Sequence, residues 1–231
     1  MKTLGIIGGL GPDSTIDYYR FLLASYRAKT GGSSAPSIFI NSLDVERVID
    51  LITAGNHNEL AQYLSTEIER LARAGASFGL IAANTPHIVF DDLVHVSRIP
   101  LISIVETACD KAKALGLRRV ALVGTRYTMQ RDFYPKVFSA KGVGLVTPRP
   151  DDQEYVHEKY MTELLKGRFL PETRDGLLAV MERLQQDENV DGILLAGTEL
   201  PLVLRGTPEV AIPVLDTTQL HVEAAINLLL S

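Results

Sequence analysis

Short apolar runs alternate along this chain of 231 residues with longer stretches in which apolar residues recur every three or four positions. Most of the short runs are nearly continuous, which is typical of parallel strands covered on both faces. They predict strands at Leu4–Ile7, Ser37–Asn41, Leu80–Ala83, Leu101–Ile104, Val120–Val123, Gly144–Val146, Ile193–Leu195 and Ala211–Leu215. The longer stretches predict helices at Asp13–Arg27, Asn58–Arg73, Val105–Leu115, Gln130–Ala140, Asp152–Lys166, Thr173–Gln186 and Thr217–Leu230. Strand and helix in alternation indicate an α/β fold with parallel sheets.

The two halves of the sequence resemble each other. Residues 4–9 and 120–125 are each an apolar run that leads into a glycine turn, and residues 80–85 and 194–199 each end in small polar residues. The second feature follows the first after 75 residues in one half and after 73 in the other. This match favours a duplicated unit over a chance likeness of short apolar strands. We predict two α/β domains, residues 1–100 plus 211–231 and residues 101–210, because the last helix is expected to return to the first half.

Composition and charge exclude several classes of function. The net charge is −5, the sequence pI is near 5.6, and no run of Lys or Arg stands out. Nucleic acid and membranes are therefore not expected as partners. The apolar runs are too short for a membrane-spanning helix and the first residues lack the layout of a signal peptide, so we expect a cytoplasmic protein. The single cysteine, Cys109, allows no intrachain disulfide, and no thiol pair has the spacing of a metal site.

A glycine-rich segment, Gly8–Thr15, links the first predicted strand to the first predicted helix. It is not a dinucleotide fingerprint, because Ser14 stands where the third glycine belongs, and it lacks the Gly-Lys-Ser/Thr ending of a P-loop. Two interpretations remain open. Asp13 or Ser14 caps the helix that follows a tight turn, or the backbone amides at Gly9 and Leu10 bind a carboxylate at the helix N-terminus.

Two polar pairs, Asn84-Thr85 and Thr198-Glu199, follow predicted strands in the two halves. Ligands of open α/β sheets bind beside the carboxyl ends of strands, so these side chains either bond a ligand or cap the next helix. Together with the Gly8–Thr15 turn, and with Leu-Pro after the second pair, they occur in the same order as in cofactor-independent aspartate/glutamate racemases. The chain resembles this family over essentially its whole length.

The resemblance implies two pseudo-symmetric, Rossmann-like parallel-sheet domains with the ligand cleft between them. It also implies chemistry without a cofactor: no pyridoxal phosphate, nucleotide or metal takes part. In the family one cysteine precedes Asn-Thr and another precedes Thr-Glu, on opposite sides of the substrate α-carbon. One thiolate removes the α-proton, and the opposite thiol returns a proton to the other face. Two groups are needed because one base does not easily serve both faces of a bound stereocentre.

This chain departs from the family at both cysteine positions. Ala83 stands at the first and Gly197 at the second, and neither residue has a side chain that accepts a proton. Possible substitutes for the missing bases are Glu199, His87 and Thr198. These three residues do not form an obvious pair that would serve both faces of a substrate, so loss of the thiols is expected to slow the reaction by at least about 10²–10⁴-fold.

The resemblance also implies positive side chains for the carboxylates of an acidic amino acid. Arg47 lies just after a predicted strand, where relatives often place a ligand for the side-chain carboxylate, and Lys166 ends a helix in a region from which relatives supply a lysine. Solvated surface charge is the alternative for Lys166. The predicted substrate-binding residues are Gly9, Leu10, Arg47, Ala83, Asn84, Thr85, Lys166, Gly197, Thr198 and Glu199.

Two functions therefore stay open. One is a racemase or epimerase that acts on aspartate, glutamate or a related amino acid by removal of its α-proton. The other is a family member that binds a small carboxylate or amino acid without racemising it, or that acts on a different substrate. The missing cysteines favour the second, whereas the retained polar pairs favour a preserved ligand site. The resemblance further implies a homodimer.

Overall fold

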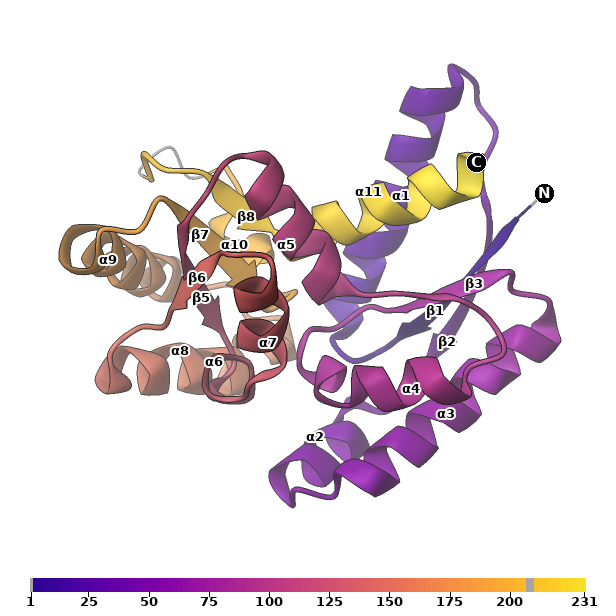
Figure 1. Ribbon diagram of the computed structural model, residues 1–231, viewed down its shortest axis with the longest axis horizontal. Helices are drawn as coiled ribbons and strands as arrows, with labels where there is room; N and C mark the ends of the chain where they lie inside the picture. The colour runs from indigo at the N-terminus through magenta and orange to yellow at the C-terminus, as the bar shows by residue number, and fades with distance from the viewer. Residues whose placement is uncertain (1, 207–209) are drawn as a thin grey trace. The chain divides into compact units, whose positions relative to one another are not determined.

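The structure is a computed structural model that describes residues 2–206 and 210–231 (Figure 1). Met1 and residues 207–209, which fall in the two predicted domains, lie outside the described residues. Two four-stranded sheets are present. The chain divides into two compact units, residues Met1–Ile104 with Thr218–Ser231, and residues Val105–Thr217. Each unit contains one of the sheets.

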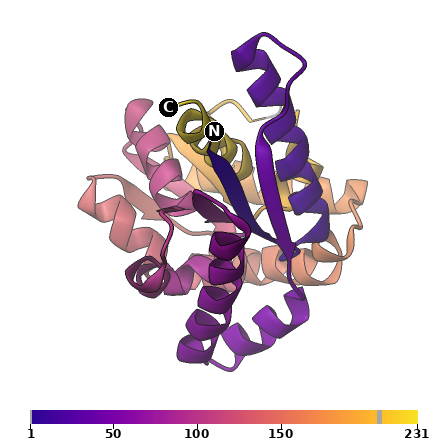
Figure 2. The same ribbon diagram turned by 90° about the vertical axis from the view of Figure 1, so that its right-hand side faces the viewer.

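The first unit holds a sheet in the order β2-β1-β3-β4. Its strands are β1 (Thr3–Gly8), β2 (Ser37–Ser42), β3 (Phe78–Ile81) and β4 (Leu101–Ile102). All neighbours pair in parallel, and β1 and β2 run side by side in Figure 2. Because the strands are parallel, the segments that follow their carboxyl ends lie along one edge of the sheet.

Helices cover both faces of this first sheet. They are α1 (Pro12–Thr30), α2 (Val45–Thr53), α3 (His57–Ala74), the 3-10 helix η1 (Thr85–Val89), α4 (Phe90–Val96) and α11 (Thr217–Leu230). Leu4 and Ile6 of β1 pack with Leu22 of α1 and Ile226 of α11 in one buried cluster. The alternate face of β1 meets α3: a Cβ added at Gly5 would lie 3.2 Å from the Leu71 side chain.

The second unit repeats this plan with a sheet in the order β6-β5-β7-β8. Its strands are β5 (Arg119–Gly124), β6 (Gly144–Val146), β7 (Gly192–Ala196) and β8 (Val214–Asp216), all parallel. In both sheets the first strand of the unit pairs with the second and the third, and the fourth lies at an edge. The predicted α/β class, with two parallel sheets of matching topology, is confirmed.

Helices also cover both faces of the second sheet (Figure 1). They are α5 (Ile104–Ala114), α6 (Arg126–Gln130), α7 (Phe133–Ala140), α8 (Pro150–Thr162), η2 (Leu164–Lys166), α9 (Pro171–Glu188) and α10 (Leu200–Leu204). Tyr160 of α8 and Leu177 of α9 share a buried cluster with Ile193 and Leu195 of β7. Cys109 of α5 is fully buried. None of the described helices is long and apolar enough to cross a membrane.

Several predicted boundaries were wrong. The strand predicted at Leu80–Ala83 ends at Ile81, and that predicted at Leu101–Ile104 ends at Ile102 because Ile104 begins α5. The strand predicted at Ala211–Leu215 begins only at Val214. In each case an apolar run continues beyond the residues that pair with a neighbouring strand, and periodicity alone does not mark where pairing stops.

The helices show three further differences. The single helix predicted at Gln130–Ala140 is two short helices, α6 and α7, with a break between Gln130 and Phe133. The helix predicted at Asp152–Lys166 ends at Thr162, and one 3-10 turn completes the segment. Helix α2 was missed although Asp44 caps it by accepting a hydrogen bond from the backbone N–H of Glu46 at 3.0 Å.

Candidate functional site

The glycine turn after β1 is closed by its own hydrogen bonds. The N–H of Gly9 donates to Thr15 Oγ1 at 2.9 Å, and that hydroxyl donates to the Gly11 carbonyl at 2.9 Å. Gly9 has a φ of +77°, and an added Cβ would lie 2.4 Å from the Leu43 carbonyl oxygen, so glycine is required here. Gly11 is the N-cap of α1 without a side-chain cap, and Ser14 bonds back to its carbonyl. Of the two interpretations of this turn, the one in which Asp13 or Ser14 caps α1 is therefore wrong.

Ala83 and Asn84 lie just past the carboxyl end of β3, where both are buried. Asn84 occupies the N-cap position of η1, but its side chain does not cap that helix. The alternative that this amide serves as a helix cap is therefore wrong. Thr85 begins η1 and is half-buried. The segment thus presents a buried amide at a strand end, which is where ligands of parallel α/β sheets bind.

His87 is buried, and hydrogen bonds engage both of its ring nitrogens. The N–H of Ile104 donates to Nε2 at 3.2 Å, which leaves Nδ1 to carry the proton and to donate to the Ala83 carbonyl at 3.0 Å. Its ring stacks on Phe90. Burial, and next the positive charge that His221 can carry, lower the pKa of His87 to about 3. His87 therefore connects the segment after β3 to the start of α5, an arrangement that suits a structural role better than that of a base.

A second buried histidine, His221 of α11, lies beside it, with the two ring centroids 6.3 Å apart. His221 Nε2 donates to the Ile102 carbonyl at 3.0 Å, and Nδ1 accepts a hydrogen bond from the Tyr18 hydroxyl at 3.0 Å. Burial lowers the pKa of His221 to about 4. Both imidazoles are therefore neutral near pH 7.

Arg47 lies in the first turn of α2, shortly after the carboxyl end of β2. Its guanidinium carbon is 4.1 Å from the centroid of the Tyr63 ring, a cation–π contact that restrains an otherwise exposed side chain. Arg47 thus carries a positive charge a few residues after the carboxyl end of β2.

The segment after β7 in the second unit carries a buried carboxyl group. Glu199 and Thr198 are each 1% exposed. Thr198 Oγ1 donates to Glu199 Oε2 at 2.9 Å, and the Tyr160 hydroxyl of α8 donates to the same oxygen in a short hydrogen bond. Glu199 precedes α10 without capping it. Burial, and next the Glu199 carboxylate, raise the pKa of Tyr160 well above its usual range, so the phenol acts as a donor.

Gly197 lies between β7 and this carboxyl group. Its φ is outside the left-handed region, so the backbone does not demand glycine. Packing is what requires glycine here, because an added Cβ would lie 2.5 Å from Tyr160 Cε2 and 3.3 Å from its hydroxyl oxygen. The aromatic ring of Tyr160 thus occupies the volume that any side chain at position 197 would need.

Lys166 and the residues that follow β5 show no sign of a ligand site. Lys166 ends η2 and is exposed. After β5, Thr125 caps α6 by accepting a hydrogen bond from the Thr128 N–H, and Arg126 forms an ion pair with Glu154 at 2.6 Å. These contacts indicate a helix start and a surface ion pair rather than a ligand site.

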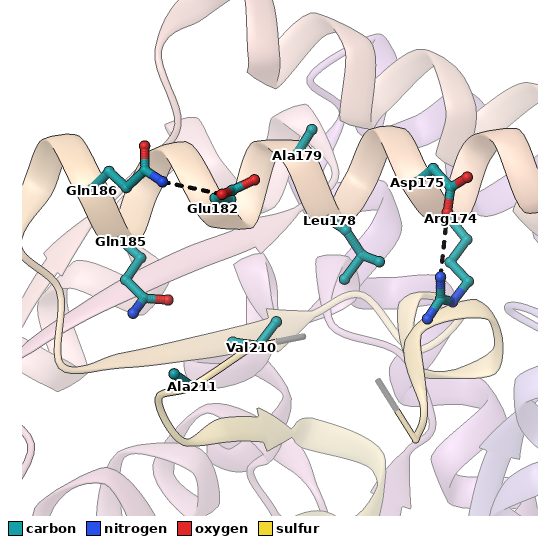
Figure 3. Close-up of a pocket in the computed structure, with 9 residues that line it drawn as sticks. All are labelled: Arg174, Asp175, Leu178, Ala179, Glu182, Gln185, Gln186, Val210 and Ala211. Carbon is teal, nitrogen blue, oxygen red and sulfur yellow. Dashed lines mark hydrogen bonds and ion pairs between the residues drawn. The ribbon is translucent and has the colours of Figure 1, made fainter. Parts of the chain in front are cut away.

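A surface pocket of about 520 Å³ lies between α9 and residues Val210 and Ala211 (Figure 3). The α9 residues that line this pocket run from Arg174 to Gln186, and none of the predicted substrate-binding residues is among the residues that line it. Its polar side chains already bond one another: Arg174 pairs with Asp175 at 3.3 Å, and Gln186 donates to Glu182 at 3.1 Å. The described residues contain no group of His, Cys, Asp and Glu that could hold a metal ion.

Two parallel four-stranded units of one topology, each with buried polar residues at the carboxyl edge of its sheet, define a duplicated α/β protein. Residues 7–225 match the Asp/Glu/hydantoin racemase family. The broad specificity amino-acid racemase RacX of Bacillus subtilis is 24% identical, with 97% of this chain and 96% of RacX covered. The chain therefore belongs to the Asp/Glu/hydantoin racemase family, and the predicted family resemblance is confirmed.

Crystal structures of relatives support the same assignment. A protein from Yersinia pestis assigned as an Asp/Glu racemase gives a TM-score of 0.89 at 33% identity, with 100% of both chains covered. An aspartate racemase homologue from Pyrococcus horikoshii gives a TM-score of 0.85 at 31% identity, again with 100% of both chains covered. The likeness thus extends over both units.

Around Gly197, Thr198 and Glu199, the sequence did not predict the participation of Tyr160. It lies on the buried side of α8 with Val156, four residues earlier, a spacing typical of an ordinary core stripe. Its partner Glu199 is 39 residues away along the chain. No local signal connects the two.

Proposed function

We propose that this protein is a cofactor-independent amino-acid racemase or epimerase that removes and returns the α-proton of aspartate, glutamate or a related amino acid. Family membership over residues 7–225 supports the proposal. So do the names of two relatives, a broad specificity amino-acid racemase and a glutamate racemase from Francisella tularensis whose structure contains D-glutamate. The latter has a TM-score of 0.66 at 13% identity.

One observation carries most of the proposal. The equivalent strands β3 and β7 are each followed by buried polar side chains, Asn84 in one unit and Thr198 with Glu199 in the other, and none of the three caps the next helix. The carboxyl edge of a parallel sheet is where ligands bind. We assign Asn84 and Thr198 to recognition of the amino and carboxyl groups of the substrate, with Thr85 as a further donor.

Arg47 is assigned to the side-chain carboxylate of the substrate. Its position after β2 and its stacking on Tyr63 support this role, because a guanidinium held in one orientation loses less entropy when it forms a bidentate pair. Less in the structure supports a role in substrate binding for Gly9, Leu10 and Lys166. The Gly9 N–H is already bonded to Thr15, and Lys166 is an exposed residue.

Binding without racemisation is the second candidate function, and Ala83 and Gly197 favour it. The family resemblance implies cysteines at these two positions, and neither residue present has a side chain that carries a proton. A protein that keeps Asn84, Thr85 and Thr198 retains polar side chains that can bind a small carboxylate or an amino acid. Turnover by a slower route requires another group at the carboxyl edge, and Glu199 is the buried carboxyl group placed there.

Proton NMR in D₂O distinguishes these functions. The protein is incubated with L- and D-forms of a panel of amino acids, and the α-proton signal is followed while line broadening or saturation transfer reports binding. Loss of the α-proton from aspartate or glutamate is the expected result. Binding with complete retention of every α-proton would instead establish the second function.

We also propose a homodimer formed at β2. This strand lies at the edge of its sheet, and Phe39 and Ile40 are 38% and 42% exposed. An exposed apolar edge strand favours pairing with a second chain. Light scattering on a sizing column should give about twice the 25.3 kDa of one chain, and Ile40→Lys should yield the single-chain mass. Val96→Lys, at an exposed apolar position of α4, is the matched control. A single-chain mass for the unaltered protein would contradict the proposal.

A further inference from the structure

Gly197, Tyr160 and Glu199 form one interdependent cluster. The Tyr160 ring lies where a side chain at position 197 would project, with Cε2 only 2.5 Å from the position of an added Cβ. The same residue reaches Glu199 through its hydroxyl group. A larger residue at 197 would therefore displace the ring and break the bond to the carboxyl group.

The surroundings of Tyr160 hold the ring in this place. Tyr160 is 6% exposed and packs with Val156, Leu164 and Leu195 in the core of the second unit. An aromatic ring in a dense core does not move aside without disturbing its neighbours. Glycine at 197 is thus the residue that allows the ring to approach and to donate to Glu199.

We propose that Tyr160 is a positioning residue for Glu199, and that Glu199 is the proton-carrying group at the carboxyl end of β7. This inference rests on the proposed function, since it names the group that serves one face of the substrate. It also assigns a purpose to Gly197, which makes room for the Tyr160–Glu199 pair.

The proton transfer balances without a further reactant. A Glu199 carboxylate oxygen forms an O–H bond as the substrate Cα–H bond breaks, and the electron pair moves into the substrate carboxylate as an enediolate. Return of the proton to Cα reverses both changes. Tyr160 keeps its own proton throughout, and its hydroxyl and that of Thr198 donate to Oε2. Donors of this kind stabilise the ionised carboxylate, which burial would otherwise disfavour.

The test uses Tyr160→Phe, which keeps the ring against Gly197 and removes only the hydroxyl group. The Tyr160 phenol of α8 and the adjacent Thr198 hydroxyl both donate to Glu199 Oε2. Loss of one donor to a carboxylate should raise the pKa of Glu199 by about one to two units. Carbon-13 NMR of the glutamate carboxyl carbons, with Glu199 assigned through Glu199→Gln, measures this shift without any need for turnover.

The control is Tyr155→Phe, on the same helix, whose hydroxyl group lies near Gly176 of α9 rather than near Glu199. This variant should leave the pKa of Glu199 unchanged. An equal pKa of Glu199 in Tyr160→Phe and in the unaltered protein would overturn the positioning role. In the exchange reaction, Tyr160→Phe should move the acidic limb of the pH profile upward and lower kcat more than it changes KM.

Glu199→Gln separates this inference from the proposed function. A fall of α-proton exchange by about 100-fold or more is expected when a general base is removed, and Glu199→Asp should retain part of the activity if the amide variant folds poorly. Unchanged exchange in both variants would overturn Glu199 as the proton-carrying group and leave the proposed function standing. Absence of exchange in the unaltered protein, despite ligand binding, would overturn the proposed function and the proton-carrying role together, while the carbon-13 titration would still decide the positioning role.

Discussion

His87 Nδ1 lies 3.0 Å from the carbonyl oxygen of Ala83, so a buried imidazole fixes the backbone at the residue where the family resemblance implies a catalytic cysteine. The other ring nitrogen accepts the N–H of Ile104 at 3.2 Å. If the ring were protonated, the N–H at Nε2 of His87 would face the N–H of Ile104, and two donors cannot bond each other. The neutral tautomer is therefore a condition for the observed structure.

Acid should destabilise the fold through His87 and His221. Their pKa values in the folded protein, about 3 and about 4, lie below the ordinary value of 6.5. The unfolded chain therefore binds protons that the folded chain does not, so stability is full above pH 6.5 and is lost as the pH falls toward 4 and then 3. Each histidine should contribute about 2 kcal/mol of destabilisation by pH 5.

Urea unfolding between pH 8 and pH 5 measures this loss. His221→Gln and His87→Gln should each flatten the pH dependence, whereas His95→Gln, at an exposed position of α4, should leave it unchanged. A pH dependence that is the same in all three variants would show that these histidines are not neutral in the fold.

Removal of His87 should also lower stability at neutral pH. His87→Ala leaves the N–H of Ile104 without its acceptor and opens a cavity beside Phe90. We expect a loss of about 2–4 kcal/mol in the free energy of unfolding at pH 8. A loss below about 0.5 kcal/mol would mean that the hydrogen bonds of His87 do not stabilise the segment after β3.

Arg47→Ala should weaken binding of aspartate or another dicarboxylate by about 1.5–3 kcal/mol, the range for a hydrogen bond to a charged group. Calorimetric titration gives the dissociation constant directly. Arg73→Ala removes an arginine of α3 that pairs with Glu69 at 3.1 Å, and it should not change the affinity. Equal affinities of Arg47→Ala and the unaltered protein would remove Arg47 from the site.

Gly197→Cys should destabilise the fold unless Tyr160 is made smaller. The new side chain meets the Tyr160 ring, and overpacking of this kind costs about 1–3 kcal/mol. Tyr160→Leu in the same chain should recover part of that loss, which a double-mutant cycle of unfolding free energies would detect as coupling. Additive effects of the two substitutions would show that the ring does not fill the space at 197.

The same geometry changes how the thiols should be restored. Ala83→Cys with Gly197→Cys adds both expected thiols, but the clash with Tyr160 would misplace the second. We expect α-proton exchange to rise further when Tyr160→Leu is added to that pair. If the triple variant folds but exchanges the α-proton no faster than the unaltered protein, positions 83 and 197 are not where two catalytic thiols act.

Much of the fold could be predicted from the sequence because buried parallel strands consist of nearly continuous apolar runs. Asn84 and Thr198 were found for a related reason: each directly follows such a run, so its place at a strand end could be read from the chain. Tyr160 could not be found in this way. Its helical spacing is that of a core residue, and its role depends on a contact with Glu199 that only the folded chain creates. The tight packing on Gly197 is likewise a tertiary feature.

The decisive measurement compares two rates for L-aspartate and L-glutamate in D₂O, the loss of the α-proton by NMR and the formation of the D-enantiomer by chiral chromatography. With a proton-carrying carboxyl group at Glu199 and no such side chain at Ala83, exchange should be detectable, should exceed inversion, and should be far slower than in relatives that have both cysteines. It should fall by about 100-fold or more in Glu199→Gln. Inversion that is as fast as exchange and is unaffected by Glu199→Gln would contradict the role of Glu199 as the proton-carrying group. Complete retention of the α-proton by a protein that binds the amino acid would contradict it as well.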